Sequence, residues 1–297
     1  MNNNTLFVLG GNDGEMAVIK QLLSMHGIRW IQPNTGWGNH IYGLADLDLK
    51  MRVKDTQSQH GLTFQLYPPH QYIEGDPEVI FVECHPKDDW PTHAKPKVID
   101  HHGERSGEPA SILQVLDLLM PIEYMGSNVQ YDARSKTHFH RHLARQISPV
   151  TLRWVEIVAA NDCGYIPAMM ALGATDDEIK RVRAFDRSAQ GITSTQEVAA
   201  EIAVRRALTD GRLTVVKLPH NKTATVTDRL YGQYDQLLIL SEDGEVNFFG
   251  DGELCAKLKD KFGGWNGGSG LGKKGDNAFW GGSPVHDEVE QFICEQL

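Results

Sequence analysis

The sequence lacks the features that mark disulfide-rich, zinc-ribbon and membrane proteins. Its four cysteines, Cys84, Cys163, Cys255 and Cys294, stand singly and form no C-x-x-C pair, so neither a disulfide framework nor a zinc ribbon is predicted. No stretch approaches the roughly 18 consecutive apolar residues of a membrane helix, and the first residues show no basic-then-apolar leader pattern. We therefore expect a cytoplasmic protein with no membrane partner.

Basic residues are in the minority. The chain has 29 Lys and Arg against 39 Asp and Glu, a formal net charge of -10. This charge repels polyanions at long range and argues against a protein that coats nucleic acid. A phosphoester substrate would need bound cations or a local basic patch. At 297 residues and 40% hydrophobic content, the chain is long enough for two modest domains.

Short apolar runs alternate with helical patterns in the first part of the chain. The expected elements are strands at 5–9, 78–84 and 97–100, with helices at 15–26 and 109–119. Such alternation predicts an α/β fold in which a mostly parallel sheet is flanked by helices and covered on both faces. Ligands of such folds bind at the carboxyl ends of the strands.

A second, smaller α/β domain is expected at the C-terminus. Helical patterns at 152–161 and 176–185 give way to Gly191-Ile192-Thr193-Ser194-Thr195, which we take as a linker between domains at 1–190 and 191–297. Asp243-Gly244 between two apolar runs predicts a hairpin. The other expected elements are a helix at 196–208, strands at 213–218, 236–241 and 245–249, a glycine-dense loop, and a helix at 284–296.

Acidic and imidazole side chains follow the expected strands. They are Asp13 and Glu15 after the first strand, Glu83 and His85 after the second, and Asp100, His101 and His102 after the third. In a parallel sheet these ends lie side by side, and hard oxygen ligands with one or two imidazoles suit Mn²⁺ or Mg²⁺. Two such ions about 3.5 to 4 Å apart could clamp a phosphate for in-line attack.

The turn after the first strand argues against a dinucleotide-binding site. The run Gly10-Gly11-Asn12-Asp13-Gly14 does not have the G-x-G-x-x-G spacing. The carboxylates of Asp13 and Glu15 would also repel a phosphate that carries no metal ion. A metal ion between the carboxylates removes that objection. The alternative for Asp13 and Glu15 is a stabilising charge pair at a helix N-terminus.

The segment Val98-Ile99-Asp100-His101-His102-Gly103 resembles the Asp-His-His signature of the DHH phosphoesterase superfamily. Further positions agree in order. Asp13 and Glu15 resemble the family's acidic pair after the first strand, and Glu83 its acidic residue on a middle strand. Asp162 resembles its later helical aspartate, with a helix C-cap as the alternative, and the glycine-rich stretch 263–282 resembles the loop of its associated C-terminal domain.

The resemblance implies roles for individual residues. It makes Asp13, Glu15, Glu83, His101 and Asp162 metal ligands for one or two Mn²⁺ or Mg²⁺ ions, with Glu83 as the bridge. It implies that Asp100 orients an imidazole and that His102 contacts the phosphate or protonates the leaving oxygen. It also implies substrate contacts from Gly267, Gly268, Lys273 and Lys274.

Three positions depart from the family pattern. Leu9 stands where the family usually has a metal-binding histidine, four residues before the first acid, and His40 or His85 could complete the site instead. The family also prefers aspartate at the positions of Glu15 and Glu83. The number of ions, one or two, stays open.

The resemblance implies a metal-dependent hydrolase that cleaves a phosphodiester or phosphoanhydride bond in a small nucleotide or short single-stranded nucleic acid. The acidic charge and short chain favour a small substrate. The alternative is a catalytically degenerate DHH-like protein that binds a nucleotide or a partner without turnover. A homodimer is left open, because nothing in the sequence determines the oligomeric state.

Overall fold

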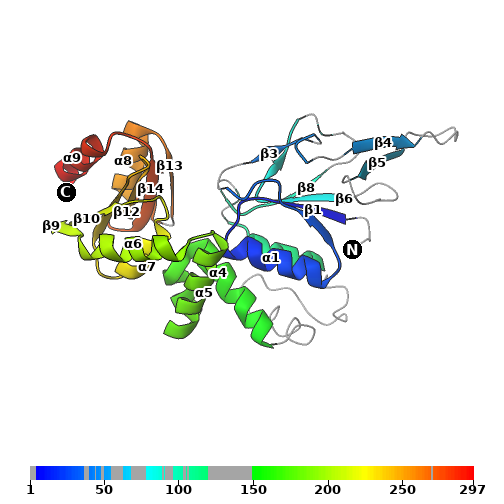
Figure 1. Ribbon diagram of the computed structural model, residues 1–297, viewed down its shortest axis with the longest axis horizontal. Helices are drawn as coiled ribbons and strands as arrows, with labels where there is room; N and C mark the ends of the chain where they lie inside the picture. Colours follow the sequence, from blue (N-terminus) through cyan, green and yellow to red (C-terminus); the bar gives the residue numbers. More distant parts are fainter. Residues whose placement is uncertain are drawn as a thin grey trace. The chain divides into compact units, whose positions relative to one another are not determined.

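The structure is a computed structural model, and its chain divides into two compact units, residues 1–190 and 191–297 (Figure 1). The division falls where the helical sequence pattern breaks at Gly191. None of the helices in the described part of the chain is long and apolar enough to span a membrane. The residues described are 5–36, 40–43, 45–47, 50–54, 63–67, 78–88, 90, 96–102, 105, 107–119, 149–268 and 270–297.

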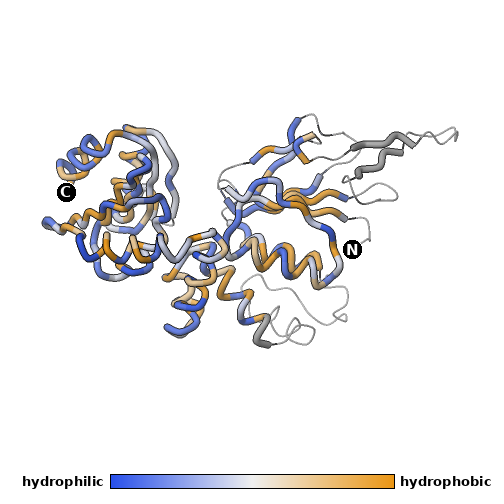
Figure 2. The backbone as a smooth tube through the Cα atoms, viewed as in Figure 1, coloured by the Kyte–Doolittle hydropathy of each residue, from blue (hydrophilic) through white to orange (hydrophobic). Residues whose placement is uncertain are grey.

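The first unit is built on a four-stranded parallel sheet in the order β2-β1-β6-β8. Its strands are β1 (Thr5–Leu9), β2 (Arg29–Ile31), β6 (Glu78–Val82) and β8 (Lys97–Ile99). β1 and β6 are hydrophobic along almost their whole length, as expected for central parallel strands (Figure 2). The predicted α/β class is confirmed.

Helices cover one face of this sheet, and α1 (Gly14–Met25) runs along that face (Figure 1). On the other face Leu6, Val8, Val79 and Phe81 pack against Tyr42, Leu47 and Trp90. Both faces of the sheet are therefore covered, as predicted, and among the residues described chain segments that carry only short strands supply the second layer. Those strands include β3 (Ile41–Tyr42), which pairs with β7 (His85–Pro86), and the hairpin of β4 (Lys50–Lys54) and β5 (Thr63–Tyr67).

The described part of the first unit contains three more helices, and one of them is broken. They are α2 (Ser111–Leu119), α4 (Pro149–Ala171) and α5 (Asp176–Ala189). Helix α4 is longer than the predicted 152–161 and is interrupted at Gly164 and Tyr165, with Pro167 just beyond. A proline inside a helix lacks the N–H of the ladder and clashes with the preceding turn, which accounts for the kink.

The carboxyl ends of three strands are aligned. Leu9 pairs with Val82, and Val82 pairs with Ile99, so each strand ends at the same level. The ladders continue for one step beyond, from Gly10 N to Val82 O at 2.9 Å and from Glu83 N to Ile99 O at 2.9 Å. The strand that follows β1 in the sequence, β2, pairs with one edge of β1, and β6 pairs with the other edge. The direction of the chain connections therefore changes at β1. The polar residues after β1, β6 and β8 therefore meet at a switch point of the sheet, where ligands of open α/β folds bind.

The second unit contains a six-stranded mixed sheet in the order β13-β14-β12-β11-β10-β9. β10 and β11 are parallel and the other pairs are antiparallel, including the predicted hairpin in which Leu240 pairs with Val246 across Asp243-Gly244. The strands are β9 (Leu208–Asp210), β10 (Leu213–Leu218), β11 (Gln236–Ser241), β12 (Val246–Asp251), β13 (Trp265–Gly267) and β14 (Asn277–Gly282). The edge strands β9 and β13 and the inner strand β14 were not predicted.

Two pairs of helices cover this sheet. Ala200 and Val226 pack with Val216 and Ile239 in one cluster, and Leu254 and Val289 pack with Phe248 and Trp280 in another. Successive strand residues face opposite sides of a sheet, so the two clusters lie on its two faces. The helices are α6 (Ser194–Arg205), α7 (Ala224–Leu230), α8 (Gly252–Phe262) and α9 (His286–Gln296).

The end of β1 lies so close to Glu83 that a side chain at Gly10 is expected to destabilise the protein. A Cβ at Gly10 would lie 2.5 Å from the backbone oxygen of Glu83. We expect Gly10→Ala to lower the free energy of unfolding, measured in urea, by about 1–3 kcal/mol, as overpacking does. Gly107→Ala is the control, because a Cβ there meets no atom within 4 Å. Equal stability of the two variants would show that the strand ends do not approach this closely.

Candidate metal centre

Four side chains from four segments of the first unit converge on one point. One ligand atom each from Glu15, Glu83, His101 and Asp162 lies within 4.8 Å of the other three. His101 Nε2 is the centre of the group, at 2.6 Å from Asp162 Oδ2, 3.3 Å from Glu83 Oε1 and 3.8 Å from Glu15 Oε2. The sequence placed all four among its predicted ligands, and the fold brings them together.

These same four atoms are buried without hydrogen-bond partners. Glu15 Oε2, Glu83 Oε1, His101 Nε2 and Asp162 Oδ2 have no partner of hydrogen-bonding geometry among the described residues. A buried polar atom left unpaired costs roughly 1–3 kcal/mol, and more for a charged group. Four such atoms aimed at one another therefore indicate that a cation belongs between them.

Glu15 is held by two helix N-termini. It lies in the first turn of α1, and its other carboxylate oxygen, Oε1, accepts a hydrogen bond from Ile112 N at 2.9 Å. Ile112 is in the first turn of α2, so both helix dipoles favour a negative charge at this position. The side chain of Glu15 is fully buried. Its Oε2 is thus fixed toward His101.

Glu83 adopts an unusual backbone conformation. Its φ of 53° is in the left-handed region, and Tyr165 is the other non-glycine residue with positive φ in the part of the chain described. This conformation costs roughly 1–2 kcal/mol for a residue with a Cβ. It turns the side chain away from the direction that β6 would give it and toward His101. Strain of this kind is found at functional sites, where surrounding structure enforces it.

Asp162 is positioned by the break in α4. It lies two residues before Gly164, where the first helical segment ends, and its side chain is 14% exposed. The helix-end interpretation of Asn161-Asp162-Cys163-Gly164 is therefore correct, and the carboxylate nevertheless contacts His101. Cys163 Sγ lies 3.8 Å from His101 Nδ1. That contact occupies Nδ1 and directs Nε2 at the carboxylates, as partners of metal-binding histidines do.

The local charges of the cluster do not balance. Burial raises the pKa of Glu15 well above its usual value, and repulsion from Asp162 and Glu83 raises it further. Burial also raises the pKa of Asp162. Burial works to raise the pKa of Glu83 as well, but contacts with His101 and Glu15 outweigh it and lower the pKa to about 2. Burial alone would lower the pKa of His101, yet contacts with Asp162, Cys163 and Glu83 raise it well above its ordinary value. Three carboxylates thus compete for one imidazole.

A divalent cation fits this donor set. Three carboxylate oxygens and one imidazole nitrogen are hard or borderline ligands of the kind that Mn²⁺ and Mg²⁺ accept. Two overlapping groups also share His101, one with Glu83 and His102 and one with Asp162 and Cys163. The divalent charge would offset the repulsion among the carboxylates, which protonation otherwise relieves.

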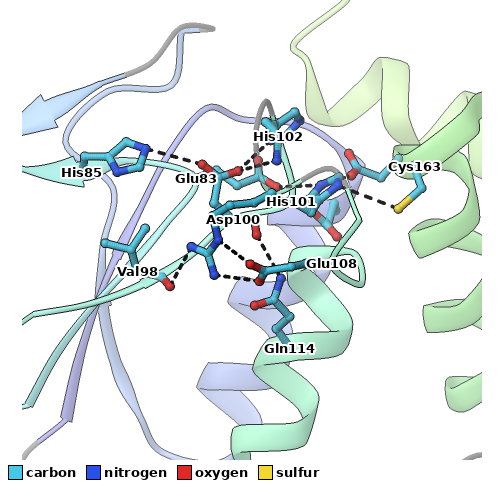
Figure 3. Close-up of polar contacts among 12 residues, drawn as sticks. Glu83, His85, Val98, Asp100, His101, His102, Glu108, Gln114 and Cys163 are labelled. Atoms are coloured by element: carbon cyan, nitrogen blue, oxygen red, sulfur yellow. Dashed lines mark hydrogen bonds and ion pairs between the residues drawn. The ribbon is translucent and has the colours of Figure 1, made fainter. Parts of the chain in front are cut away.

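Asp100 forms a second polar group beside the first (Figure 3). Its Oδ1 accepts hydrogen bonds from His102 N and pairs with His102 Nδ1, both at 2.9 Å, and its Oδ2 lies 3.4 Å from His85 Nε2. Its backbone oxygen accepts a hydrogen bond from Gln114 at 3.1 Å. The His102 side chain is 59% exposed, so it is the accessible imidazole of this group. Asp100 thus contacts two imidazoles, those of His102 and His85, and its role in orienting an imidazole stays a prediction.

Asp13 plays a different part from its neighbour Glu15. Its Oδ1 accepts a hydrogen bond from Met16 N at 2.7 Å and caps α1, so the helix-terminus interpretation holds for this residue. Burial raises its pKa, as do Asp162 and Glu83, which shows that it lies near the cluster. It is not one of the four converging ligands found among the described residues. Its role as a ligand stays a prediction.

The predicted substrate contacts belong to the second unit. Gly267 ends β13 opposite Phe279, and Gly268 follows with a φ of 103°. Lys273 and Lys274 are exposed in the turn between β13 and β14. This turn is folded back on α8, since Gly275 N donates to the capping Asp251 at 2.6 Å and Gly272 N to Gly252 O at 2.9 Å. Contact of these residues with substrate stays a prediction.

Comparisons with known proteins give weak similarities. No protein-family model and no curated protein matches the sequence. Among solved structures, the chain is similar to the pGpG-specific phosphodiesterase PggH from Vibrio cholerae, at 14% identity and a TM-score of 0.36 over 98% of both chains. It is also similar to RecJ from Thermus thermophilus in complex with Mg²⁺, at 12% identity and a TM-score of 0.40 over 98% of this chain and 48% of that one. An uncharacterized protein from Helicobacter pylori matches at 10% identity and a TM-score of 0.22, over 98% of both chains. Similarity at this level establishes no shared activity.

The left-handed backbone of Glu83 predicts an inverted order of stability for two substitutions. Glycine is usually less stable than alanine in ordered structure, but at a positive φ the alanine Cβ is strained. We therefore expect Glu83→Gly to be more stable than Glu83→Ala by about 1 kcal/mol in urea unfolding. Both variants should lose Mn²⁺ binding alike. An alanine variant as stable as the glycine variant would contradict the conformation described.

Proposed function

We propose that this chain is a metal-dependent phosphoesterase of the DHH type that hydrolyses a phosphodiester or phosphoanhydride bond. The observation that carries the proposal is the set of four buried atoms of Glu15, Glu83, His101 and Asp162 at the carboxyl edge of the sheet, which converge on one point and have no hydrogen-bond partner among the described residues. A contribution to folding stability does not account for this cluster, because buried carboxylates that repel one another destabilise a fold unless a cation lies between them.

Each residue of the site has a part in the proposed reaction. Glu15, Glu83, His101 and Asp162 would hold one divalent ion. Mn²⁺ or Mg²⁺ there would lower the pKa of water and neutralise charge on a phosphoryl oxygen. His102 has Nδ1 committed to Asp100, which leaves Nε2 to hydrogen-bond the phosphate or protonate the leaving oxygen.

The substrate we propose is a small nucleotide or a short single-stranded oligonucleotide. The net charge of -10 opposes long polyanions, whereas a small phosphoester presents little charge outside the site. In the second unit, Lys273 and Lys274 would provide positive charge for a phosphate, and Gly267 and Gly268 would allow close backbone approach.

A phosphoester panel tests the proposal. Purified protein is incubated with short RNA and DNA oligomers, linear and cyclic dinucleotides and pyrophosphate, with Mn²⁺, Mg²⁺ or chelator. We expect hydrolysis that requires metal. Asp162→Asn should lower kcat/KM by more than the roughly 10- to 100-fold that loss of an outer partner of a ligand costs. Asp177→Asn, at an exposed position in the first turn of α5, is the control and should retain full activity.

The alternative, a binding protein without turnover, gives a different outcome in the same experiment. Mn²⁺ at 100 times its dissociation constant would stabilise the fold by about 2.7 kcal/mol in either case. Thermal stabilisation by Mn²⁺ that Asp162→Asn abolishes, without hydrolysis of any substrate, would support binding alone. Absence of both effects would contradict a metal site.

Substitution of Leu9 provides a second test that distinguishes a working enzyme from a binding protein without turnover. It is fully buried in the core at the end of β1. For a working enzyme we expect Leu9→His to destabilise the protein by about 1–3 kcal/mol, the cost of an unpaired buried polar group, and to give no gain in turnover. Hydrolysis that appears only in Leu9→His would identify a degenerate site that has lost a ligand.

A further inference from the structure

Helix α5 contains a buried ion pair that contacts chain segments of the proposed metal site. Arg183 Nη1 is 2.8 Å from Asp186 Oδ2, and both side chains are less than one-tenth exposed. Burying two charges costs more than their attraction returns unless every donor and acceptor is satisfied. The partners of this pair therefore indicate what it does.

Asp186 is bonded to the turn that carries the first acidic residues. Its Oδ1 accepts a hydrogen bond from Gly14 N at 2.9 Å, and Gly14 lies between Asp13 and Glu15. A Cβ at Gly14 would be 3.1 Å from that oxygen, so the absence of a side chain permits the close approach. Gln190 Nε2 donates to Asp186 Oδ2 at 2.9 Å. The start of α1 is thus fixed to the end of α5.

Arg183 is bonded to the segment that carries Asp162. Its Nη1 also donates to Asn161 Oδ1 at 2.9 Å, and its guanidinium lies 4.5 Å from the centre of the Tyr165 ring. Asn161 directly precedes Asp162, and Tyr165 is the left-handed residue of the kink. The guanidinium therefore contacts α4 on both sides of the ligand.

We propose that the Arg183–Asp186 pair is a positioning element that sets the separation between the Glu15 and Asp162 carboxylates. Its two ends hold the chain segments that carry these residues, although the pair is not part of the ligand set found in the described residues. This inference rests on the proposed metal site. With the pair removed, the two segments are free to separate, and one ion no longer reaches both carboxylates.

A matched pair of variants tests this role. Arg183→Met removes the buried guanidinium. Arg153→Met removes another guanidinium that joins α4 to α5, through Glu178 at 2.9 Å and Gly173 O at 3.0 Å, away from the cluster. Binding of Mn²⁺ to the full chain is measured by calorimetry and by electron paramagnetic resonance, well below the unfolding temperature of each variant.

We expect Arg183→Met to weaken Mn²⁺ binding by on the order of 10- to 100-fold, the usual effect of losing a partner of a ligand shell. Its Mn²⁺ spectrum at saturation should also differ from that of the wild type, because the ligand geometry has changed. Arg153→Met should keep both the affinity and the spectrum, whatever its stability. A loss of stability alone does not alter the spectrum of the bound ion.

Two results would overturn the inference, and they differ from failure of the proposed function. If the wild type and folded Arg183→Met bind Mn²⁺ with equal affinity and spectrum, the pair has no positioning role. If Arg153→Met weakens binding as much as Arg183→Met, the effect is general. If the wild type binds no Mn²⁺, the metal site itself is wrong.

A milder variant serves if Arg183→Met does not fold. Gln190→Leu removes one hydrogen bond to Asp186 and leaves the ion pair in place. It should change Mn²⁺ affinity and spectrum in the same direction as Arg183→Met, by a smaller amount. Unchanged Mn²⁺ affinity and spectrum in folded Gln190→Leu would also count against the inference.

Discussion

The first unit is organised around the burial of carboxylates next to a single imidazole. Burial in a low-dielectric interior opposes charge, and like charges close together oppose it further. The fold partly offsets this by directing backbone donors at the outer oxygens, from Met16 N to Asp13 and from Ile112 N to Glu15. The inner oxygens face His101 and have no hydrogen-bond partner among the residues described. Negative charge around His101 therefore remains unbalanced. The local geometry of the neighbouring segments follows from the need to hold these carboxylates close together.

Three local irregularities serve this point. Gly10 allows the end of β1 to approach Glu83, the positive φ of Glu83 turns its side chain, and the break at Gly164 ends a helix beside Asp162. Each lowers stability relative to regular structure, and together they lie within a few residues of the cluster. Regular strands and helices with satisfied ends would fold at lower cost. The three irregularities are concentrated at one edge of the sheet. Selection for a site, rather than for stability, produces such a concentration.

The sequence indicated the residues of the cluster better than it indicated what holds them in place. Glu15, Glu83 and His101 follow buried strands, and local patterns locate strand ends well when apolar runs are bounded by glycine or polar residues. The α/β class followed from the same alternation. The contact of Cys163 with His101 joins residues 62 apart, and that of Asp186 with Gly14 joins residues 172 apart. No local pattern encodes such pairs. The edge strands β9 and β13 have three residues each, too few to show a period.

The sequence predicted that both faces of the sheet are covered, but not which segments cover the second face. Alternation of strands and helices indicates that helices pack on a sheet, but it does not say on which face each one lies. Here Tyr42, Leu47 and Trp90 cover the second face from segments with little regular structure, and their apolar spacing has no helical period. Large side chains that stand alone in irregular segments can replace a helix as a covering layer, because burial depends on area and not on secondary structure.

His101 and His102 lie side by side, with ring centres 4.3 Å apart, but their surroundings differ. His101 faces three carboxylates and is almost wholly buried, whereas His102 shares Asp100 with His85 and is mostly exposed. A buried imidazole amid carboxylates suits cation binding, and an exposed one oriented by a carboxylate suits exchange of protons with a substrate. Adjacent residues on one strand end reach these two environments because β8 ends between β6 and the start of α2. Leu9 fills a core position at the end of β1, so among the described residues both imidazoles of these groups, His101 and His102, follow β8 and neither comes from β1.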